Sequence, residues 1–216
     1  MRRFIKIIIL FLISINSSAI DFKIGLLRNV KLKSVIISAS ENSFKLMEGM
    51  NELFDLKEGE QIKISFSKNK IKLNFKGRLV GIYDTLKLLK INNDTSVFSV
   101  QGDIPNFKKR AYYDELCVFA SNQLLTLVNL INFENYIVGV LESEVGLNRS
   151  KDFYKVHAVI SRTYALKNQY KFIHEGFYLT DLVNCQVYKG NMYKNNRIIE
   201  AVKETKNLIL VDENMD

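Results

Sequence analysis

The chain has 216 residues, of which 47% are hydrophobic and 25% are charged, and its formal net charge at pH 7 is +8. This length can bury one large core or two small ones, and the apolar content excludes an intrinsically disordered chain. The positive residues are scattered along the sequence, which disfavours a protein that binds nucleic acid.

The first part of the chain has the pattern of a secretory signal peptide at residues 1–19. It begins with basic residues, continues with an apolar run at 7–15 and ends at the small residues Ser17, Ser18 and Ala19. The apolar run is shorter than the ~20 residues that a spanning helix needs. We therefore expect cleavage after Ala19, export to the periplasm or cell envelope, and contact with the membrane only through this segment. Its removal lowers the net charge from +8 to +5.

Residues 20–110 are predicted to form a β-rich N-terminal region. Short runs that alternate apolar and polar residues, bounded by Gly, Asn, Asp or Ser, predict strands at 33–40, 61–68, 70–77 and 95–102. A hairpin turn is predicted between the second and third of these runs, and residues 84–90 fit either a short helix or a strand. Pro105 is the predicted boundary to the next unit.

Residues 111–216 are predicted to form a mixed unit of helices and strands, so the fold class is α+β. Two strands are followed by two helices, for which Asn132 and Ser150 are suitable N-caps and Gly146 is a suitable stop for the first. The remaining predicted elements are strands at 178–183 and 186–190, a helix at 197–205 and a last strand at 207–211.

Glu144 is the most informative acidic residue, because it is the next position on the apolar stripe of the first predicted helix. The stripe consists of Phe133, Tyr136, Ile137, Val140 and Leu141. Glu142 points elsewhere, since residues two apart do not share a helix face. A carboxyl at the end of an apolar face is partly desolvated, which suits a general acid. The alternative is a carboxylate at the helix end that is turned to solvent.

The second predicted helix has two distinct faces. Its core stripe is predicted to consist of Phe153, Val156, Ile160 and Tyr164. Lys155 and Arg162 are seven residues apart and therefore share another, basic face. This face is either a site for an anionic or hydroxyl-bearing ligand or simply a solvated surface.

Several blocks of this part resemble the SpoIID/LytB family of stage II sporulation protein D and amidase enhancers. The family's Y-x-x-G-V-x-x-S-E block is matched by Tyr136, Gly139, Val140, Ser143 and Glu144. Its K-A-x-A-x-x-x-R-T-Y block is matched by Lys155, Ala158, Arg162, Thr163 and Tyr164. Weaker similarity continues at 185–190 and 200–205. The resemblance implies a SpoIID/LytB-like domain at 111–216 that is incomplete at its C-terminus, because the family domain ordinarily extends further.

The resemblance implies that the protein is a peptidoglycan lytic transglycosylase with Glu144 as its catalytic residue. One acid/base group suffices for this reaction, because the 6-hydroxyl of the sugar is the nucleophile. The basic positions Lys155 and Arg162 are expected to bind substrate, and the matching blocks add Tyr136, Ser143, Gln186 and Tyr188. The alternative is a non-catalytic protein that binds peptidoglycan or enhances a cell-wall amidase, which would then be its partner.

No cofactor or metal ion is expected. Some family members hold zinc, but here only His174 and Cys185 are candidate ligands, whereas a structural zinc site normally has four. Cys117 and Cys185 are the only cysteines, and they either form a disulfide in an oxidising compartment or are two free thiols. The second interpretation is slightly favoured, because Cys117 lies in an apolar predicted strand.

Overall fold

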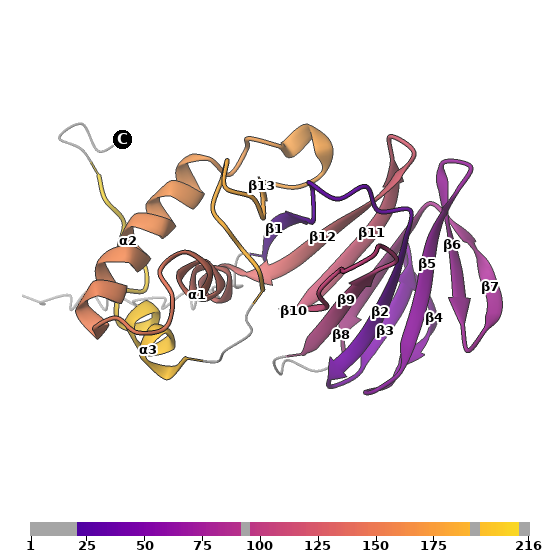
Figure 1. The fold of residues 1–216 in the computed structure, drawn as a ribbon, viewed down its shortest axis with the longest axis horizontal. Helices are drawn as coiled ribbons and strands as arrows, with labels where there is room; N and C mark the ends of the chain where they lie inside the picture. Colours follow the sequence, from indigo (N-terminus) through magenta and orange to yellow (C-terminus); the bar gives the residue numbers. More distant parts are fainter. Residues whose placement is uncertain (1–20, 92–95, 191–194, 212–216) are drawn as a thin grey trace, which may run out of the picture.

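The structure is a computed structural model that describes residues 21–91, 96–190 and 195–211. The predicted signal peptide lies outside the described residues. Figure 1 shows two β-sheets at one end of the molecule and three helices at the other, which confirms the α+β fold class. In the described part of the chain, no helix is both long enough and apolar enough to cross a membrane.

The chain passes between the two sheets several times along the sequence. One sheet, called the seven-stranded sheet, has the order β13–β1–β12–β11–β8–β3–β4. Its strands are β1 (Asp21–Leu26), β3 (Phe44–Glu48), β4 (Asn51–Leu56), β8 (Thr85–Lys90), β11 (Glu115–Ser121), β12 (Leu124–Asn132) and β13 (Leu179–Thr180). The other, called the six-stranded sheet, has the order β10–β9–β2–β5–β6–β7. Its strands are β2 (Ser34–Glu41), β5 (Gln61–Ser67), β6 (Lys70–Phe75), β7 (Arg78–Tyr83), β9 (Val97–Gly102) and β10 (Arg110–Tyr113).

The alternating sequence runs form strands because one face of each is buried between the sheets. In β5, for example, Ile62 and Ile64 are fully buried, whereas Gln61 and Lys63 are exposed. The predicted hairpin between β5 and β6 is confirmed, and its turn residues Lys68 and Asn69 have the positive φ angles typical of a tight turn. Residues 84–90 form a strand, β8, and not a helix.

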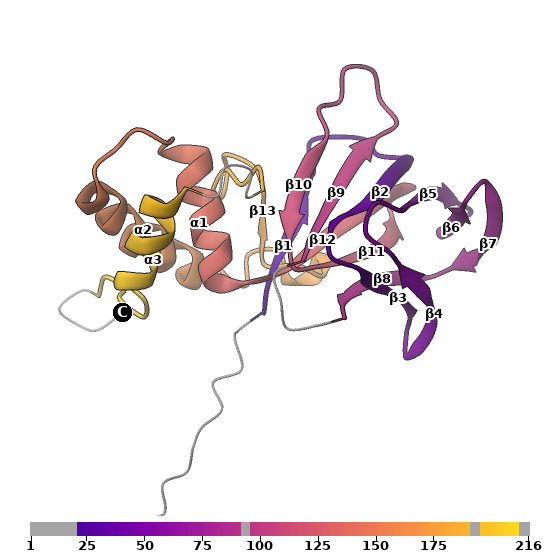
Figure 2. The ribbon, with the colours of Figure 1, turned by 90° about the horizontal axis from the view of Figure 1, so that it is seen from below.

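The sheets pack face to face as a sandwich with one apolar core (Figure 2). Aromatic pairs cross between the sheets, with Phe44 and Phe98 6.3 Å apart and Phe54 and Phe75 4.7 Å apart between ring centroids. The sandwich does not end at the predicted boundary near residue 110, since β10 pairs with β9 and β11 pairs with β8. Strands therefore continue in the same two sheets up to Asn132.

Three helices follow the sandwich: α1 (Phe133–Glu144), α2 (Lys151–Lys167) and α3 (Asn196–Glu204). The predicted caps are confirmed: the side chains of Asn132 and Ser150 accept backbone N–H groups of α1 and α2, respectively. Gly146, with φ of 80°, follows the end of α1. Because β12 ends at Asn132 and α1 begins at the next residue, strand and helix are directly continuous.

The predicted core stripe of α2 is wrong. Phe153, Val156 and Ile160 are all exposed. The residues that α2 buries are instead mostly small or polar: Tyr154, Ala158, Ser161, Arg162 and Ala165. Small side chains let α2 approach α1 and α3 closely, and the larger apolar residues face outward as a consequence.

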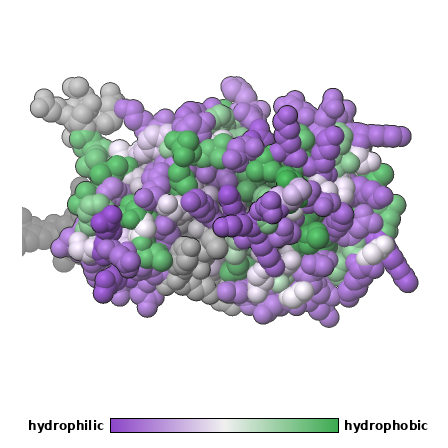
Figure 3. Space-filling view, in the orientation of Figure 1, coloured by the Kyte–Doolittle hydropathy of each residue, from purple (hydrophilic) through white to green (hydrophobic). Residues whose placement is uncertain are grey.

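The predicted strand at 207–211 does not form, nor does the one at 186–190. The backbone N–H of Leu210 donates to Oγ1 of Thr163, so this tail runs along α2 and does not join a sheet. Its apolar side chains are about half exposed, and they are Leu208, Ile209, Leu210 and Val211. On the face that Figure 3 shows, hydrophobic surface is gathered over this tail, and smaller hydrophobic patches lie among the hydrophilic surface of the sandwich.

Candidate functional site

The last turn of α1 lies against residues 185–190, called here the 185–190 segment. The backbone N–H of Val187 donates to Oε1 of Glu144 at 2.8 Å, and that of Lys189 donates to Oγ of Ser143 at 3.0 Å. Both N–H groups lie two residues apart in an extended segment and therefore point the same way. Neighbouring side chains of α1 thus hold the segment in place and also fix the orientation of Glu144.

A buried chain of hydrogen bonds lies beneath this contact. The hydroxyl of Tyr136 donates to Oε1 of Gln186 at 3.2 Å, and Nε2 of Gln186 donates to the carbonyl of Ser161 at 3.3 Å. Burial raises the pKa of Tyr136 well above its ordinary value, with a further increase from the nearby ionisable groups of Cys185 and Glu144. Tyr136 therefore stays protonated at neutral pH and connects α1, the segment and α2.

Tyr188 anchors the segment to the sandwich. Its ring lies 5.8 Å from that of Tyr112 in β10 and 5.3 Å from that of Tyr136 in α1. Its hydroxyl donates to Oδ1 of Asn129 in β12 at 3.0 Å. Tyr188 is completely buried, so its place in the structure is that of a packing residue.

The second half of the segment has further fixed neighbours. The backbone N–H of Tyr188 donates to the carbonyl of Asp181, whose carboxylate accepts the N–H of Leu27 at the end of β1. At the last residue, Gly190 has φ of 91°, and a Cβ there would overlap the carbonyl oxygen of Ala111 in β10. The chain can pass this close to the sheet only with glycine.

Arg162 is not placed as a substrate-binding residue would be. Its side chain is buried, and Nε and Nη2 donate to both oxygens of Glu134 at 3.2 and 2.8 Å. Nη1 donates to the carbonyl of Leu208 at 2.9 Å, and Nη2 also reaches that of Val202 at 3.4 Å. The guanidinium therefore holds α1, α2 and the end of α3 together.

Lys155 shares the face of Arg162, as predicted, but this face packs against α3. Its ammonium group pairs with Glu204 at 2.6 Å and lies 3.9 Å from Asp152. Among the described residues, neither Lys155 nor Arg162 forms an ion pair with Glu144. The structure thus brings Tyr136, Ser143, Glu144, Gln186 and Tyr188 together, and it places the two predicted cations elsewhere.

Of the two alternatives for Glu144, the structure shows the carboxylate turned to solvent, and the buried acidic residue of α1 is Glu142. Glu144 is exposed, whereas Glu142 is only 6% exposed and accepts the backbone N–H of Asn195 at 3.3 Å. An apolar stripe predicts one buried face for this helix, but α1 is covered by α2, by α3 and by the 185–190 segment. Its second half is therefore buried on several sides, and only its final turn reaches solvent.

Tyr164 is a neighbour of Glu144 that was not among the predicted site residues. Burial raises the pKa of its phenol, and the nearby ionisable groups of Cys185 and Glu144 raise it further. Its hydroxyl is 3.4 Å from the carbonyl of Asn184 and lies near the surface. Tyr164 is the last residue of the matched R-T-Y block, which could have identified it. The predicted core stripe of the second helix instead places it in the core.

Cys185 is buried beside this group and Cys117 is half buried in β11, and both are free thiols. The interpretation of two unpaired cysteines is thus confirmed. Within residues 21–91, 96–190 and 195–211, no three His, Cys, Asp or Glu side chains gather so that they could hold a metal ion.

The arrangement provides one oriented carboxylate at the surface. Oε1 of Glu144 is held by Val187, and Oε2 has no hydrogen-bond partner among the described residues. A carboxylate fixed through one oxygen presents the other in a defined direction, where it can exchange a proton with a bound ligand. Tyr164 stands beside it as a hydroxyl that stays protonated.

Comparisons with known proteins identify part of the chain. The family model of the stage II sporulation protein, SpoIID, matches residues 121–211. An uncharacterized protein of Brachyspira hyodysenteriae (strain ATCC 49526 / WA1) is 34% identical over 104 residues, which cover 46% of this chain and 27% of that protein. The match thus spans about a quarter of the relative's length. No solved structure matches the chain.

Proposed function

We propose that the protein is an exported peptidoglycan lytic transglycosylase, because residues 121–211 match the family model of the stage II sporulation protein, SpoIID, whose family is cell-wall-related. Glu144 is the proposed acid/base group and the glycan strands of the cell wall are the proposed substrate. The observation that carries the proposal is the fixed orientation of Glu144 at the surface, with Oε1 bound to Val187 N–H and Oε2 open.

The proposed reaction needs a single proton-carrying group. Protonated Glu144 donates its proton to the glycosidic oxygen as the bond from that oxygen to the anomeric carbon breaks. The resulting carboxylate then accepts the proton of the sugar's own 6-hydroxyl while that oxygen bonds to the anomeric carbon. Glu144 ends protonated, an anhydro sugar is formed, and no water is consumed.

The other predicted site residues take supporting parts in this proposal. Ser143 and Gln186 hold the 185–190 segment that orients Glu144, and Tyr136 and Tyr188 support it from the core. Lys155 and Arg162 act through the packing of α3, since their charged groups are used there. No cofactor takes part in the proposed reaction.

The test is Glu144→Gln, with release of anhydro-muropeptides from purified peptidoglycan as the readout. Glutamine keeps the oxygen that accepts the N–H of Val187 but cannot transfer the proton, so the rate should fall at least about 10²-fold with the fold unchanged. Glu200→Gln, an exposed carboxylate on α3, is the matched control and should cleave at the original rate. Equal release by the Glu144 variant would contradict the proposal.

A second candidate function is a non-catalytic protein that binds peptidoglycan or enhances a cell-wall amidase. It is favoured by the exposure of Glu144 and by the use of Lys155 and Arg162 in packing, because the two predicted cations pair with Glu204 and Glu134 and not with Glu144. This function predicts sedimentation with peptidoglycan that is unchanged by Glu144→Gln, without release of sugar. Stimulation of an added cell-wall amidase would then identify the enhancer.

A further inference from the structure

The outer face of the six-stranded sheet carries two grooves that join. The larger has a volume of about 1110 Å³ and follows β5 and β6, and the smaller, of about 460 Å³, lies where β9 leaves the sheet. Both are lined by Ile36 and Lys63, so they form one continuous depression, called here the sheet groove. In Figure 1, β5 and β6 lie on the side of the sandwich away from α1, the helix whose last residue is Glu144.

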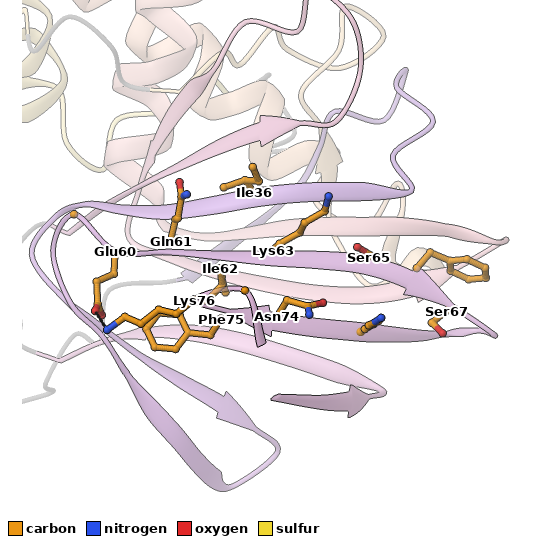
Figure 4. A pocket seen from close by; sticks show the side chains of 14 residues that line it. Ile36, Glu60, Gln61, Ile62, Lys63, Ser65, Ser67, Asn74, Phe75 and Lys76 are labelled. Carbon is orange, nitrogen blue, oxygen red and sulfur yellow. Dashed lines mark ion pairs between the residues drawn. The ribbon is translucent and has the colours of Figure 1, made fainter. Parts of the chain in front are cut away.

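The register of the strands places three polar side chains and one isoleucine in a row across this groove. Gln101 of β9 lies opposite Ile36 of β2, which lies opposite Lys63 of β5, which lies opposite Asn74 of β6. Strands are about 4.8 Å apart, so this row extends over roughly 14 Å. Figure 4 shows Lys63 and Asn74 on neighbouring strands of the groove.

The groove suits a hydroxyl-rich ligand. Its lining includes the hydroxyls of Ser65 and Ser67 and the carboxamides of Gln61 and Asn74. Hydroxyl and carboxamide groups both donate and accept hydrogen bonds, as the hydroxyl and acetamido groups of amino sugars require. The volume exceeds the ~300–1,000 Å³ of ordinary small-molecule pockets, which favours a segment of a polymer.

The charges of the groove favour a ligand that carries carboxylates. Three lysines, Lys63, Lys72 and Lys76, line the larger groove against one carboxylate, Glu60. Lys76 pairs with Glu60 at 2.8 Å, and Lys63 reaches Asp103 at 3.4 Å. Both lysines are at least half exposed, so these pairs are weak and can be exchanged for a ligand carboxylate.

Lys72 is the lysine available without such an exchange. It is exposed, lies opposite Ser65 of β5, and has no ion-pair partner in the part of the chain that the structure describes. A nucleic acid would need a dense row of cations beside aromatic stacking surfaces, and although Phe66 and Phe75 line the groove, its cations are few. One unpaired and two exchangeable lysines among hydroxyls and amides fit the sparser carboxylates of a glycan better.

We propose that the sheet groove binds a carboxylate-bearing glycan strand through Lys63 and Lys72, with Asn74, Gln61 and the serines of β5 contacting its hydroxyl and acetamido groups. That this glycan is peptidoglycan rests on the function proposed above. The groove would then hold a strand at a distance from Glu144, so one chain would contact the wall at two places and gain avidity.

The test measures binding of peptide-free peptidoglycan glycan strands to the full chain, with Glu144→Gln in every protein so that cleavage cannot interfere. Lys63→Ala combined with Lys72→Ala should weaken binding roughly tenfold, about 1.4 kcal/mol. Lys87→Ala combined with Lys203→Ala removes the same charge from exposed positions on β8 and α3 and should leave binding unchanged. A neutral N-acetylglucosamine hexamer should bind more weakly than the glycan and respond less to the Lys63 and Lys72 changes.

Unchanged glycan binding in the Lys63/Lys72 variant, or no binding by the parent protein, would overturn the inference. So would single-stranded DNA that binds more tightly than the glycan in a groove-dependent way. Sugar release is measured separately with Glu144 intact. If sugar is released but binding does not depend on the groove, only the proposal for the sheet groove is refuted. If binding depends on the groove but no sugar is released, only the proposed transglycosylase activity is refuted.

Discussion

The sandwich and the helices are stabilised by different kinds of contact. Between the sheets the buried side chains are apolar, as with Ile37, Ile64 and Phe98, and each strand is also tied to its neighbours by backbone hydrogen bonds. Among the helices, the largest fully buried side chain is charged: Arg162. The helices also bury apolar side chains such as Ile137 and Ile198, but the helical region, which carries Glu144, depends in addition on a buried charged group that a single substitution can remove.

Arg162→Ala should cause the largest loss of stability, and this loss should be confined to the helical region. It leaves Glu134 and the carbonyl of Leu208 without the guanidinium donor, which should cost about 3–5 kcal/mol in the free energy of unfolding. Urea denaturation measures the loss, and hydrogen exchange locates it: amides of α2 and α3 should lose protection while those of β5 and β6 keep it. Arg197→Ala, at an exposed position on α3, is the control. Equal loss of protection in both regions would mean that they unfold as one unit.

Gly190→Ala should disturb the contact between the 185–190 segment and the sandwich. Its cost in the free energy of unfolding should be smaller than that of Arg162→Ala. A positive φ costs a non-glycine residue roughly 1–2 kcal/mol, and here the new Cβ would also push the chain away from Ala111. Gly49→Ala in the β3–β4 turn provides the same backbone strain with no atom within 4 Å. We expect the Gly190 variant to be the less stable of the two by urea denaturation and to lose glycan cleavage. Similar stability and activity would show that the 185–190 segment can shift without consequence.

Glu204→Gln should cause the smallest loss of stability, and the size of this loss should depend on pH. Hydrogen bonds from Lys151 and Lys155 lower the pKa of Glu204 from 4.5 to about 2. A lowered pKa in the folded state means that the carboxylate stabilises the fold above about pH 4.5 and loses this contribution as the pH falls towards 2. The difference in urea midpoint between parent and variant should therefore be present at pH 7 and shrink through this window. A difference that is constant with pH would show that the ion pairs contribute nothing.

The sequence predicts the sandwich better than the helices, for a physical reason. In β2, β5 and β6 one face is buried against the other sheet, so alternation reports burial directly. Strands β3, β4 and β7 were not predicted; β7, an edge strand, is exposed at Leu79 and Ile82, so its residues do not alternate cleanly. Caps were predicted correctly because Asn132 and Ser150 act locally.

For the candidate site, sequence motifs identify a place but not each role. Five of the seven predicted residues meet at the 185–190 segment, although only Glu144 and Ser143 lie near solvent there. The shared face of Lys155 and Arg162 follows from helix periodicity, but what covers that face depends on α3, about 40 residues later. Local patterns cannot contain that information, and the burial of Glu142 was missed for the same reason.

The direct junction of β12 and α1 at Asn132 sets the rotational phase of the helix. Each residue turns an α-helix by about 100°, so one extra residue at this junction would turn Glu144 about a quarter of a turn away from Val187. The sheet thus sets the direction in which the Glu144 carboxylate points. An insertion should therefore be tolerated far better in the loops of this protein than at this one junction.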